Sequence, residues 1–195
     1  MSRLTIPLFP LHTVLFPGGA LELRVFEARY LDMVTECMKH DAGFGICLIR
    51  EGDEVGKAAT PYDVGTLVRI SYFNRRSDGL LGITVNGERR FRIVDTEVLP
   101  NQLRRAEVEL LPAEGDCALP QAYCSMAEPL RQILEQLGYP YAKLERRYDD
   151  AVWLGARLAE LLPLKLELKQ YLLQMDDPLA RLERLRAVLD SGEYP

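Results

Sequence analysis

Few residues of this chain have the types and spacing that catalysis or metal binding requires. Cys37 and His40 lie three residues apart on a predicted helix, so an activated thiol is one interpretation, but a solvated histidine near a helix end is favoured. The four cysteines form no C-x-x-C pair, and the two histidines offer no zinc-ligand spacing. We therefore predict no catalytic residue, no metal site and no cofactor.

Two acidic pairs fit helix capping better than acid–base chemistry. Asp149-Asp150 and Asp176-Asp177 each precede a predicted helix, where a carboxylate can accept from free backbone N–H groups. The sequence contains neither a phosphate-binding G-x-x-x-x-G-K-[ST] loop nor a G-x-S-x-G elbow. We predict that the protein is not an enzyme; a hydrolase acting alone is an alternative for which we find no nucleophile–base pair.

Four Arg-Arg pairs raise the question of a nucleic-acid surface. Residues 64–112 hold eight arginines against six acidic residues, and adjacent strand residues point to opposite faces, which dilutes positive charge. The net charge of −5 over 195 residues also disfavours nucleic acid and anionic membranes as partners. RNA binding remains an alternative, with Arg89 and Arg90 as its candidate residues.

Aromatic side chains are the candidates for a binding surface. Tyr72 and Phe73 are adjacent in a predicted strand, so we expect one to face the core and the other to face solvent. Phe16 lies in a Pro-Gly loop, where burial is not assured. Together with Tyr62, these residues are our candidate polypeptide-binding residues, chosen by expected exposure, although singly exposed aromatics are also normal.

The elements that position these residues change their period near residue 112. Before it, two short apolar segments, at 5–9 (closed by Pro10) and 44–49, are expected to be strands. Alternating apolar residues predict further strands at 20–25, 68–73, 81–93 and 105–110. Residues 27–39 have helical spacing, with Ala28, Leu31, Val34 and Met38 on one face. Asp78-Gly79 predicts a hairpin turn, and Asn86-Gly87 a second turn or a bulge. About six strands and one helix suffice for a closed or nearly closed barrel.

Residues 113–195 follow the helical period instead. Apolar stripes at 126–137, 151–161, 164–175 and 179–189 predict four helices joined by short loops in a bundle. We expect Pro129 to kink or divide the first helix, and Asp177 with Pro178 to begin the last. The sequence therefore predicts an α+β chain with two subdomains, a β-barrel at 1–112 and a helical bundle at 113–195.

The opening stretch is apolar, but it is not expected to enter a membrane. Pro7, Pro10 and Pro17 interrupt it, and a spanning helix needs about 20 uninterrupted apolar residues. It also lacks the apolar core and cleavage site of a signal peptide. We expect a folded, cytoplasmic protein without a membrane partner.

The same stretch resembles the start of the Lon protease N-terminal domain, also called the LON substrate-binding domain. IPLFPLHTVLFPGGALELRVFEARYLDMV matches the family pattern L-F-P-L, V-L-F-P-G and L-x-L-x-[IV]-F-E-x-R-Y at 8–11, 14–18 and 21–30. GTLVRISYFNRRSDGLLGITVNGERRFRIV is similar to the family's G-T strand, Asp-Gly hairpin and G-x-x-R-F-x-I return. A weaker likeness, in LLPLKLELKQYLLQMDDPLARLERL, extends the resemblance over residues 4–190.

This resemblance implies a PUA-like β-barrel (a pseudobarrel) with one helix, followed by a C-terminal helical bundle. It also implies a role in recognising unfolded or degradation-bound polypeptide. Lon proteases continue into an ATPase module and a Ser-Lys protease domain, whereas this chain ends at Pro195 without a Walker motif, so we expect a stand-alone, non-enzymatic member. An adaptor with a specific folded protein partner is a further alternative, and the sequence leaves the oligomeric state open.

Overall fold

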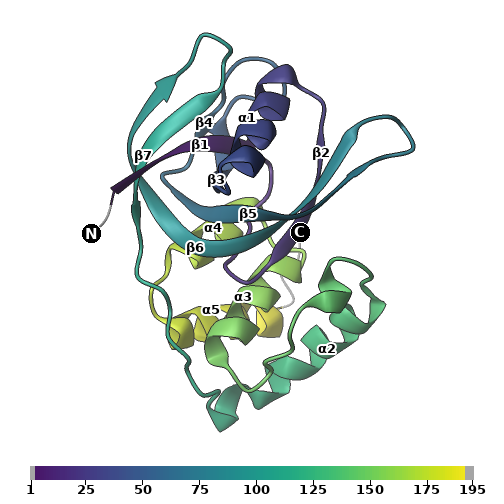
Figure 1. Cartoon of the computed structure of the whole chain (residues 1–195). Helices are drawn as coiled ribbons and strands as arrows, with labels where there is room; N and C mark the ends of the chain where they lie inside the picture. The colour runs from purple at the N-terminus through teal and green to yellow at the C-terminus, as the bar shows by residue number, and fades with distance from the viewer. Residues whose placement is uncertain (1–2, 192–195) are drawn as a thin grey trace. The chain divides into compact units, whose positions relative to one another are not determined.

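The computed structural model describes residues 3–191, and the chain divides after Pro112 into two compact units (Figure 1). The first unit contains β1 (Arg3–Leu11), β2 (Ala20–Val25), α1 (Ala28–Lys39), β3 (Phe44–Glu51), β4 (Thr60–Pro61), β5 (Val64–Arg75), β6 (Leu81–Val98) and β7 (Arg104–Leu110). The second contains the 3-10 segments η1 (Gln121–Met126) and η2 (Tyr141–Lys143) and the helices α2 (Ala127–Gln136), α3 (Ala151–Leu161), α4 (Leu166–Gln174) and α5 (Pro178–Ser191).

The strands of the first unit form a ring. β1 pairs with β7 in antiparallel and with β3 in parallel orientation, which closes the path β1–β7–β6–β5–β3 on itself. β2 joins β6, and the short β4 joins β3. Ring closure pairs backbone groups that an open sheet would leave at its edges. The predicted α+β fold, a near-barrel with one early helix followed by C-terminal helices, is confirmed.

The first strand is longer than predicted, and Pro10 does not close it. β1 continues to Leu11 because each proline lies where only one neighbour is paired: Pro7 faces β7, and Pro10 faces β3. A proline lacks the N–H donor but can occupy a strand at a position where one side needs no hydrogen bond. The strand changes partner at Leu8, which pairs with Arg104 of β7 and with Gly45 of β3.

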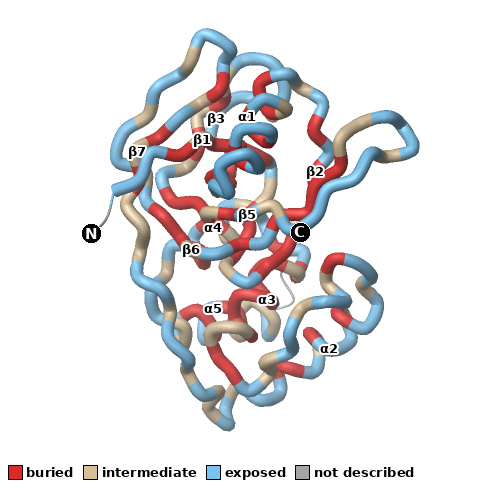
Figure 2. Tube along the Cα trace, in the orientation of Figure 1, coloured by how far each residue is buried: buried red, intermediate tan, exposed pale blue. Residues whose placement is uncertain are grey.

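Helix α1 covers the inside of the ring with one buried face. Tyr30, Met33, Val34 and Cys37 pack into the core with strand residues such as Phe9, whose ring stacks on that of Tyr30 with centroids 4.0 Å apart. These side chains form a continuous i, i+3, i+4, i+7 stripe. The predicted stripe is right at Val34, which is buried, and at Leu31, which packs against the core, but it is wrong at Ala28 and Met38, which are exposed. Figure 2 shows this buried face of the helix in red.

Both turn signals of the β5–β6 hairpin are explained by the structure. Gly79 has a φ of 84°, the left-handed conformation that the Asp-Gly signal predicts for a tight turn. At the second signal, β6 stays continuous. The register shifts between Leu67, which faces Arg89, and Val68, which faces Gly87, so Asn86-Gly87 lies beside a bulge and not in a turn.

The helices of the second unit begin largely where their caps predict. The Asp150 carboxylate accepts from the Val152 N–H at 2.9 Å, and that of Asp177 accepts from the Leu179 N–H at 2.9 Å, so both capping predictions are confirmed. Pro129 lies in the first turn of α2, where its missing donor has no intrahelical acceptor, so it does not divide the helix. Across residues 3–191, no helix is long and apolar enough to cross a membrane.

One buried arginine organises the second unit, and the sequence did not single it out. Arg181 on α5 is 1% exposed and forms a bidentate pair with Glu114 at 2.8 and 2.6 Å. It also donates to the carbonyls of Leu172 and Met175 at 3.1 and 2.7 Å. The five donors of a guanidinium allow one side chain to join the start of the unit to α4 and α5.

Candidate functional site

The one Cys–His pair is not a catalytic pair. Cys37 is buried, and its Sγ lies 3.8 Å from the Gly43 carbonyl, whereas His40 is exposed and lies 3.3 Å from a Glu36 carboxylate oxygen. Burial, with a smaller effect of Glu36, raises the pKa of the Cys37 thiol to about 11. A thiol of this kind is protonated at neutral pH and inert, so the solvated-histidine interpretation is confirmed. Within residues 3–191, no group of three or more His, Cys, Asp or Glu side chains could hold a metal ion.

The four candidate aromatic residues do not share one surface. Phe16 is 1% exposed, and its carbonyl accepts from the Gly19 N–H at 3.0 Å in the loop that turns the chain into β2. Tyr62 is half-buried and follows β4. Only Tyr72 and Phe73 are strongly exposed, at 53% and 56%. Tyr72 and Phe73 on β5 are therefore surface residues, whereas Phe16 is buried.

The expectation that one of Tyr72 and Phe73 enters the core is wrong, and a β-bulge helps to explain why. Ile70 faces Val85 and Tyr72 faces Thr84, so Ser71 is an extra residue on β5. Directly paired residues lie on the same face of a sheet, which places Ile70 and Phe73 on the face of Val85 and the buried Ile83. Phe73 nevertheless stays exposed because the hairpin continues past the ring (Figure 1).

A groove lies between the C-terminal end of α1 and β5. It has a volume of about 210 Å³ and is lined by Cys37, Met38, Asp41, Ala42 and residues 69–73. Met38 is 42% exposed, so the groove joins three exposed apolar side chains, Met38, Tyr72 and Phe73, from two elements. Cofactor and small-molecule sites usually measure about 300–1,000 Å³, so this groove suits one or two side chains of a partner.

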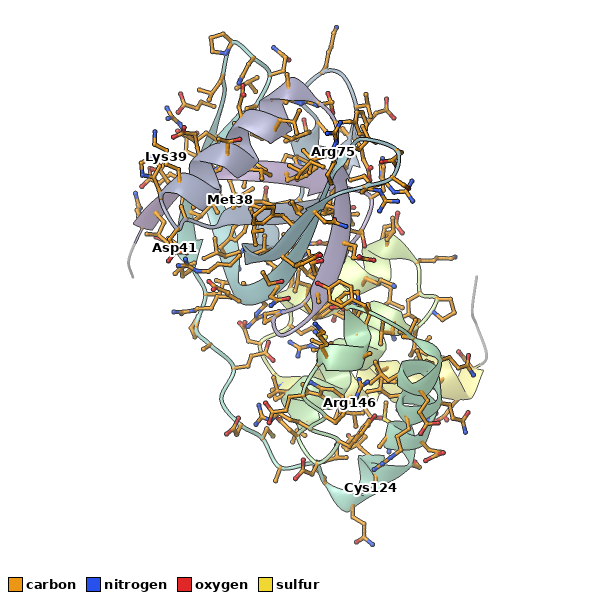
Figure 3. All side chains as sticks on the ribbon, turned by 45° about the vertical axis from the view of Figure 1, so that its right-hand side comes forward. Met38, Lys39, Asp41, Arg75, Cys124 and Arg146 are labelled. Atoms are coloured by element: carbon orange, nitrogen blue, oxygen red, sulfur yellow. The ribbon has the colours of Figure 1, made fainter. Side chains whose placement is uncertain are left out.

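An arginine network fixes the turn after α1 against β5. Arg69 donates to the Asp41 carbonyl at 2.6 Å, its Nη1 lies 3.3 Å from the Asp41 carboxylate, and its Nε lies 2.8 Å from a Glu88 carboxylate oxygen. Asp41 has a φ of 48°, which lets the chain reverse tightly after the helix. Figure 3 shows Met38, Lys39 and Asp41 together at this end of α1, with Arg75 on the hairpin.

Beside the groove, one edge of β5 is open. β3 pairs with β5 only as far as Val68, whereas β6 continues to pair with it as far as Arg75. Among the strands of residues 3–191, none pairs with the other side of β5 from Arg69 to Arg75. Such an edge presents unpaired N–H and C=O groups, and here it runs along exposed apolar side chains.

The other end of α1 carries a second pocket, of about 220 Å³, beside the exposed Phe26 and Val55. Arg29 is buried there, pairs with the Glu27 carboxylate at 3.1 Å and donates to the Gln102 carbonyl at 3.0 Å. Glu27, the N-cap residue of α1, accepts from the Gly56 N–H at 3.3 Å, and its side chain makes no cap hydrogen bond to the helix. The F-E-x-R-Y motif is therefore mainly a structural device that joins two loops to the helix start.

The residues proposed for RNA binding are not presented on the surface. Arg90 is 4% exposed, and Arg89 is half-buried with its guanidinium donating to the Leu111 carbonyl at 2.8 Å. Arg105 pairs with Glu97 at 2.6 Å, and Arg147 pairs with Asp116 at 2.6 Å. The paired arginines mostly serve local contacts, and RNA binding stays an untested alternative.

Met38 is the groove residue that sequence reasoning missed. The helical spacing predicts that Met38 lies on the buried face of the helix, but the structure places it at the edge of that face, 42% exposed. The signal was present: Tyr30, Met33, Val34 and Cys37 form a complete apolar stripe of their own, which leaves Met38 one position outside it.

The family model described as "ATP-dependent protease La (LON) substrate-binding domain" matches residues 5–191. The chain belongs to this family. The predicted resemblance is confirmed.

Solved structures of similar chains agree with this assignment. The "Lon N-terminal domain protein" from Xanthomonas campestris is 40% identical, with a TM-score of 0.80 over 98% of this chain and 99% of that one. The N-terminal domain of a Mycobacterium avium complex Lon protease, at 19% identity and a TM-score of 0.63, shares the fold.

Curated relatives are longer than this chain. Lon protease of Escherichia coli K12 is 26% identical over 197 aligned positions, which cover 97% of this chain and 25% of the relative. Lon protease 2 of Myxococcus xanthus is 30% identical over 92 positions, 46% of this chain and 11% of the relative. The chain thus spans about a quarter or less of the length of these proteases.

Proposed function

We propose that this protein is a non-catalytic module that binds unfolded or degradation-bound polypeptide in the groove between α1 and β5. The observation that carries the proposal is the meeting of three exposed apolar side chains, Met38, Tyr72 and Phe73, beside an open strand edge. Exposed apolar groups that gather in a groove are typical of binding surfaces, whereas scattered ones are ordinary. Membership of a family described as a substrate-binding domain also supports polypeptide binding.

Non-native polypeptide fits this site for a physical reason. Unfolded chains expose apolar side chains and unpaired backbone groups, and the groove offers a complement to both. The small volume accommodates a side chain or two, so affinity for any single segment is expected to be modest. Weak, sequence-tolerant binding suits a module that must accept many segments. The proposal places this binding in the cytoplasm, as the sequence predicts.

The test is fluorescence anisotropy of the full chain with a labelled unfolded polypeptide and, separately, a labelled RNA, at low and moderate salt. Apolar contacts keep their strength when salt is raised, so polypeptide binding should survive it. RNA binding through arginines would fall steeply with salt. Binding to RNA alone would replace the proposal with its alternative, and binding to neither would favour a specific folded partner.

A further inference from the structure

The hairpin shows which backbone groups of β5 face the open edge. The Arg76 N–H donates to the Leu80 carbonyl at 2.9 Å, so the backbone polar groups of Arg76 face β6. In a strand, these groups point alternately to the two sides. The backbone N–H and C=O groups of Asn74 therefore also face β6. Those of Phe73 and Arg75 face away from β6. Phe73 and Arg75 each offer one donor and one acceptor to the edge that β3 leaves uncovered.

The same two residues place their side chains on the groove side of the hairpin. Phe73 faces Ile83 and Arg75 faces Leu81 across the ladder, and residues paired in this way share a face. Ile83 belongs to the core that α1 covers, so this is the face toward α1. A strand added to the edge would thus hydrogen-bond to Phe73 and Arg75 while its alternate side chains point into the groove.

The charge at this edge favours an acidic ligand. Arg75 is exposed and forms no ion pair with any residue from 3 to 191, whereas the neighbouring Arg76 is paired with Asp78 at 3.3 Å. An unpaired arginine at the rim of a site attracts a carboxylate and disfavours a like-charged edge. Pairing of β5 with β5 of a second copy would bring two such edges together.

We propose that the bound polypeptide adds a strand to the open edge of β5. It is hydrogen-bonded to the backbone of Phe73 and Arg75, with one apolar side chain beside Met38 and an acidic side chain at Arg75. This inference rests on the proposed function and specifies its geometry. Strand addition draws affinity from main-chain hydrogen bonds and preference from alternate side chains. The favoured segment is accordingly extended and proline-free, and it carries an apolar and an acidic residue two positions apart, on the same face of the strand.

Backbone-modified peptides test this geometry without altering the protein. The probe is a fluorescein-labelled threonine-rich peptide with one central leucine and a glutamate two residues after it, so that both side chains share a face. It is made in three forms: unmodified, with alternate amides N-methylated, and with the other alternate amides N-methylated. In an added strand, only alternate amide N–H groups donate to the neighbouring strand. One methylated form should therefore lose about tenfold or more in affinity, and the other should bind as the unmodified form does. Equal affinity of the two methylated forms would overturn strand addition.

Paired substitutions at one position provide the matching test on the protein. Phe73→Ala removes the side chain, and Phe73→Pro removes in addition the outward N–H, which β6 does not use. We expect the proline variant to bind the peptide several-fold more weakly than the alanine variant, with circular dichroism showing that both are folded. Equal binding of the two variants would contradict the hydrogen bond at Phe73. Arg75→Gln should weaken binding of the peptide that contains glutamate. It should leave unchanged the binding of the same peptide with glutamine in place of glutamate.

Failure of the inference can be separated from failure of the proposed function. Absence of any binding of unfolded polypeptide to the wild-type chain would defeat both. If Met38→Ser weakens polypeptide binding while the two methylated peptides bind equally, the groove remains the binding site. That result would contradict strand addition alone. Sedimentation velocity gives the last outcome: a dimer that Phe73→Pro converts to a monomer would assign the edge to a second copy and overturn the inference.

Discussion

The two ends of α1 are built from different kinds of contact. At the N-terminal end, the Arg29 side chain is 4% exposed and is held by Glu27 and by the Gln102 carbonyl. At the C-terminal end, Met38 and the facing Phe73 expose large apolar surfaces, and the edge of β5 stays open. At the end that carries the F-E-x-R-Y motif, the buried arginine makes these ionic and carbonyl contacts, whereas the end beside the proposed groove carries no motif. Resemblance to the family is therefore strongest where the residues hold the fold.

The largest effect on stability is expected from substituting the buried arginine at the N-terminal end of α1, called here the closed end. Arg29→Met should lower the free energy of unfolding by about 3 kcal/mol, because it removes the arginine partner of the Glu27 carboxylate and of the Gln102 carbonyl in a largely buried site. Urea unfolding followed by circular dichroism measures it, and Trp153 fluorescence reports on the second unit separately. A loss below about 1 kcal/mol would show that this network does not hold the helix start.

The next largest effect concerns the reactivity of Cys37, a buried residue that lines the groove. The pKa of Cys37 is raised to about 11, so its thiolate population near pH 8 should be about a hundredfold below that of an ordinary thiol. Pulse labelling with iodoacetamide and mass spectrometry should show exposed Cys124 modified long before Cys37. Since the folded pKa lies above the unfolded value, the stability due to the protonated thiol is complete below about pH 8.5 and falls as the pH rises toward 11. Rapid labelling of Cys37 would mean that the groove opens into the core.

Removing the apolar side chains of the open end should affect binding and spare stability. We expect Met38→Ser with Phe73→Ser to weaken binding of unfolded polypeptide about tenfold, equivalent to about 1.4 kcal/mol, because both side chains are exposed in the groove. Tyr171→Ser is the matched control, since Tyr171 is 54% exposed but lies on α4. Phe26→Ser tests the pocket at the opposite end of α1, and a greater loss from it would move the site there.

The smallest effect is expected from the arginine at the open end. Arg69→Met removes pairs with Asp41 and Glu88, but the side chain is 46% exposed, so the free energy of unfolding should change by about 0–1 kcal/mol. Measured beside Arg29→Met in the same urea series, it isolates burial as the cause of the difference. Comparable losses for the two substitutions would remove the distinction between the two ends.

Local patterns predicted much of the fold. Residues 20–25 alternate and form β2 at those bounds, and residues 27–39 contain α1. The caps at Asp150 and Asp177 could be identified because a carboxylate before a helix acts on N–H groups only two or three residues away. Interactions within one turn or one strand are encoded by neighbours in sequence, so a single chain is enough to predict them.

The site was only partly predictable. Tyr72 and Phe73 are both exposed, although we expect one of them to face the core, Phe16 is buried, and Met38 is not among the predicted site residues. Two facts decided this outcome: the bulge at Ser71, which alters the alternation, and the end of β3, which uncovers the β5 edge beyond Val68. Both depend on how strands pair across the ring, and no local pattern specifies where a partner strand stops.

By itself, the sequence determined the order of elements, the change from strands to helices near residue 112, and the family. Only the tertiary structure decided which end of α1 is closed and which is open. Arg29 and Arg69 are both arginines near acidic residues, and only the first is buried, because loops from distant parts of the chain fold over it. Burial is a property of the assembled chain, and it separates a residue that stabilises this protein from one that is free to contact a partner.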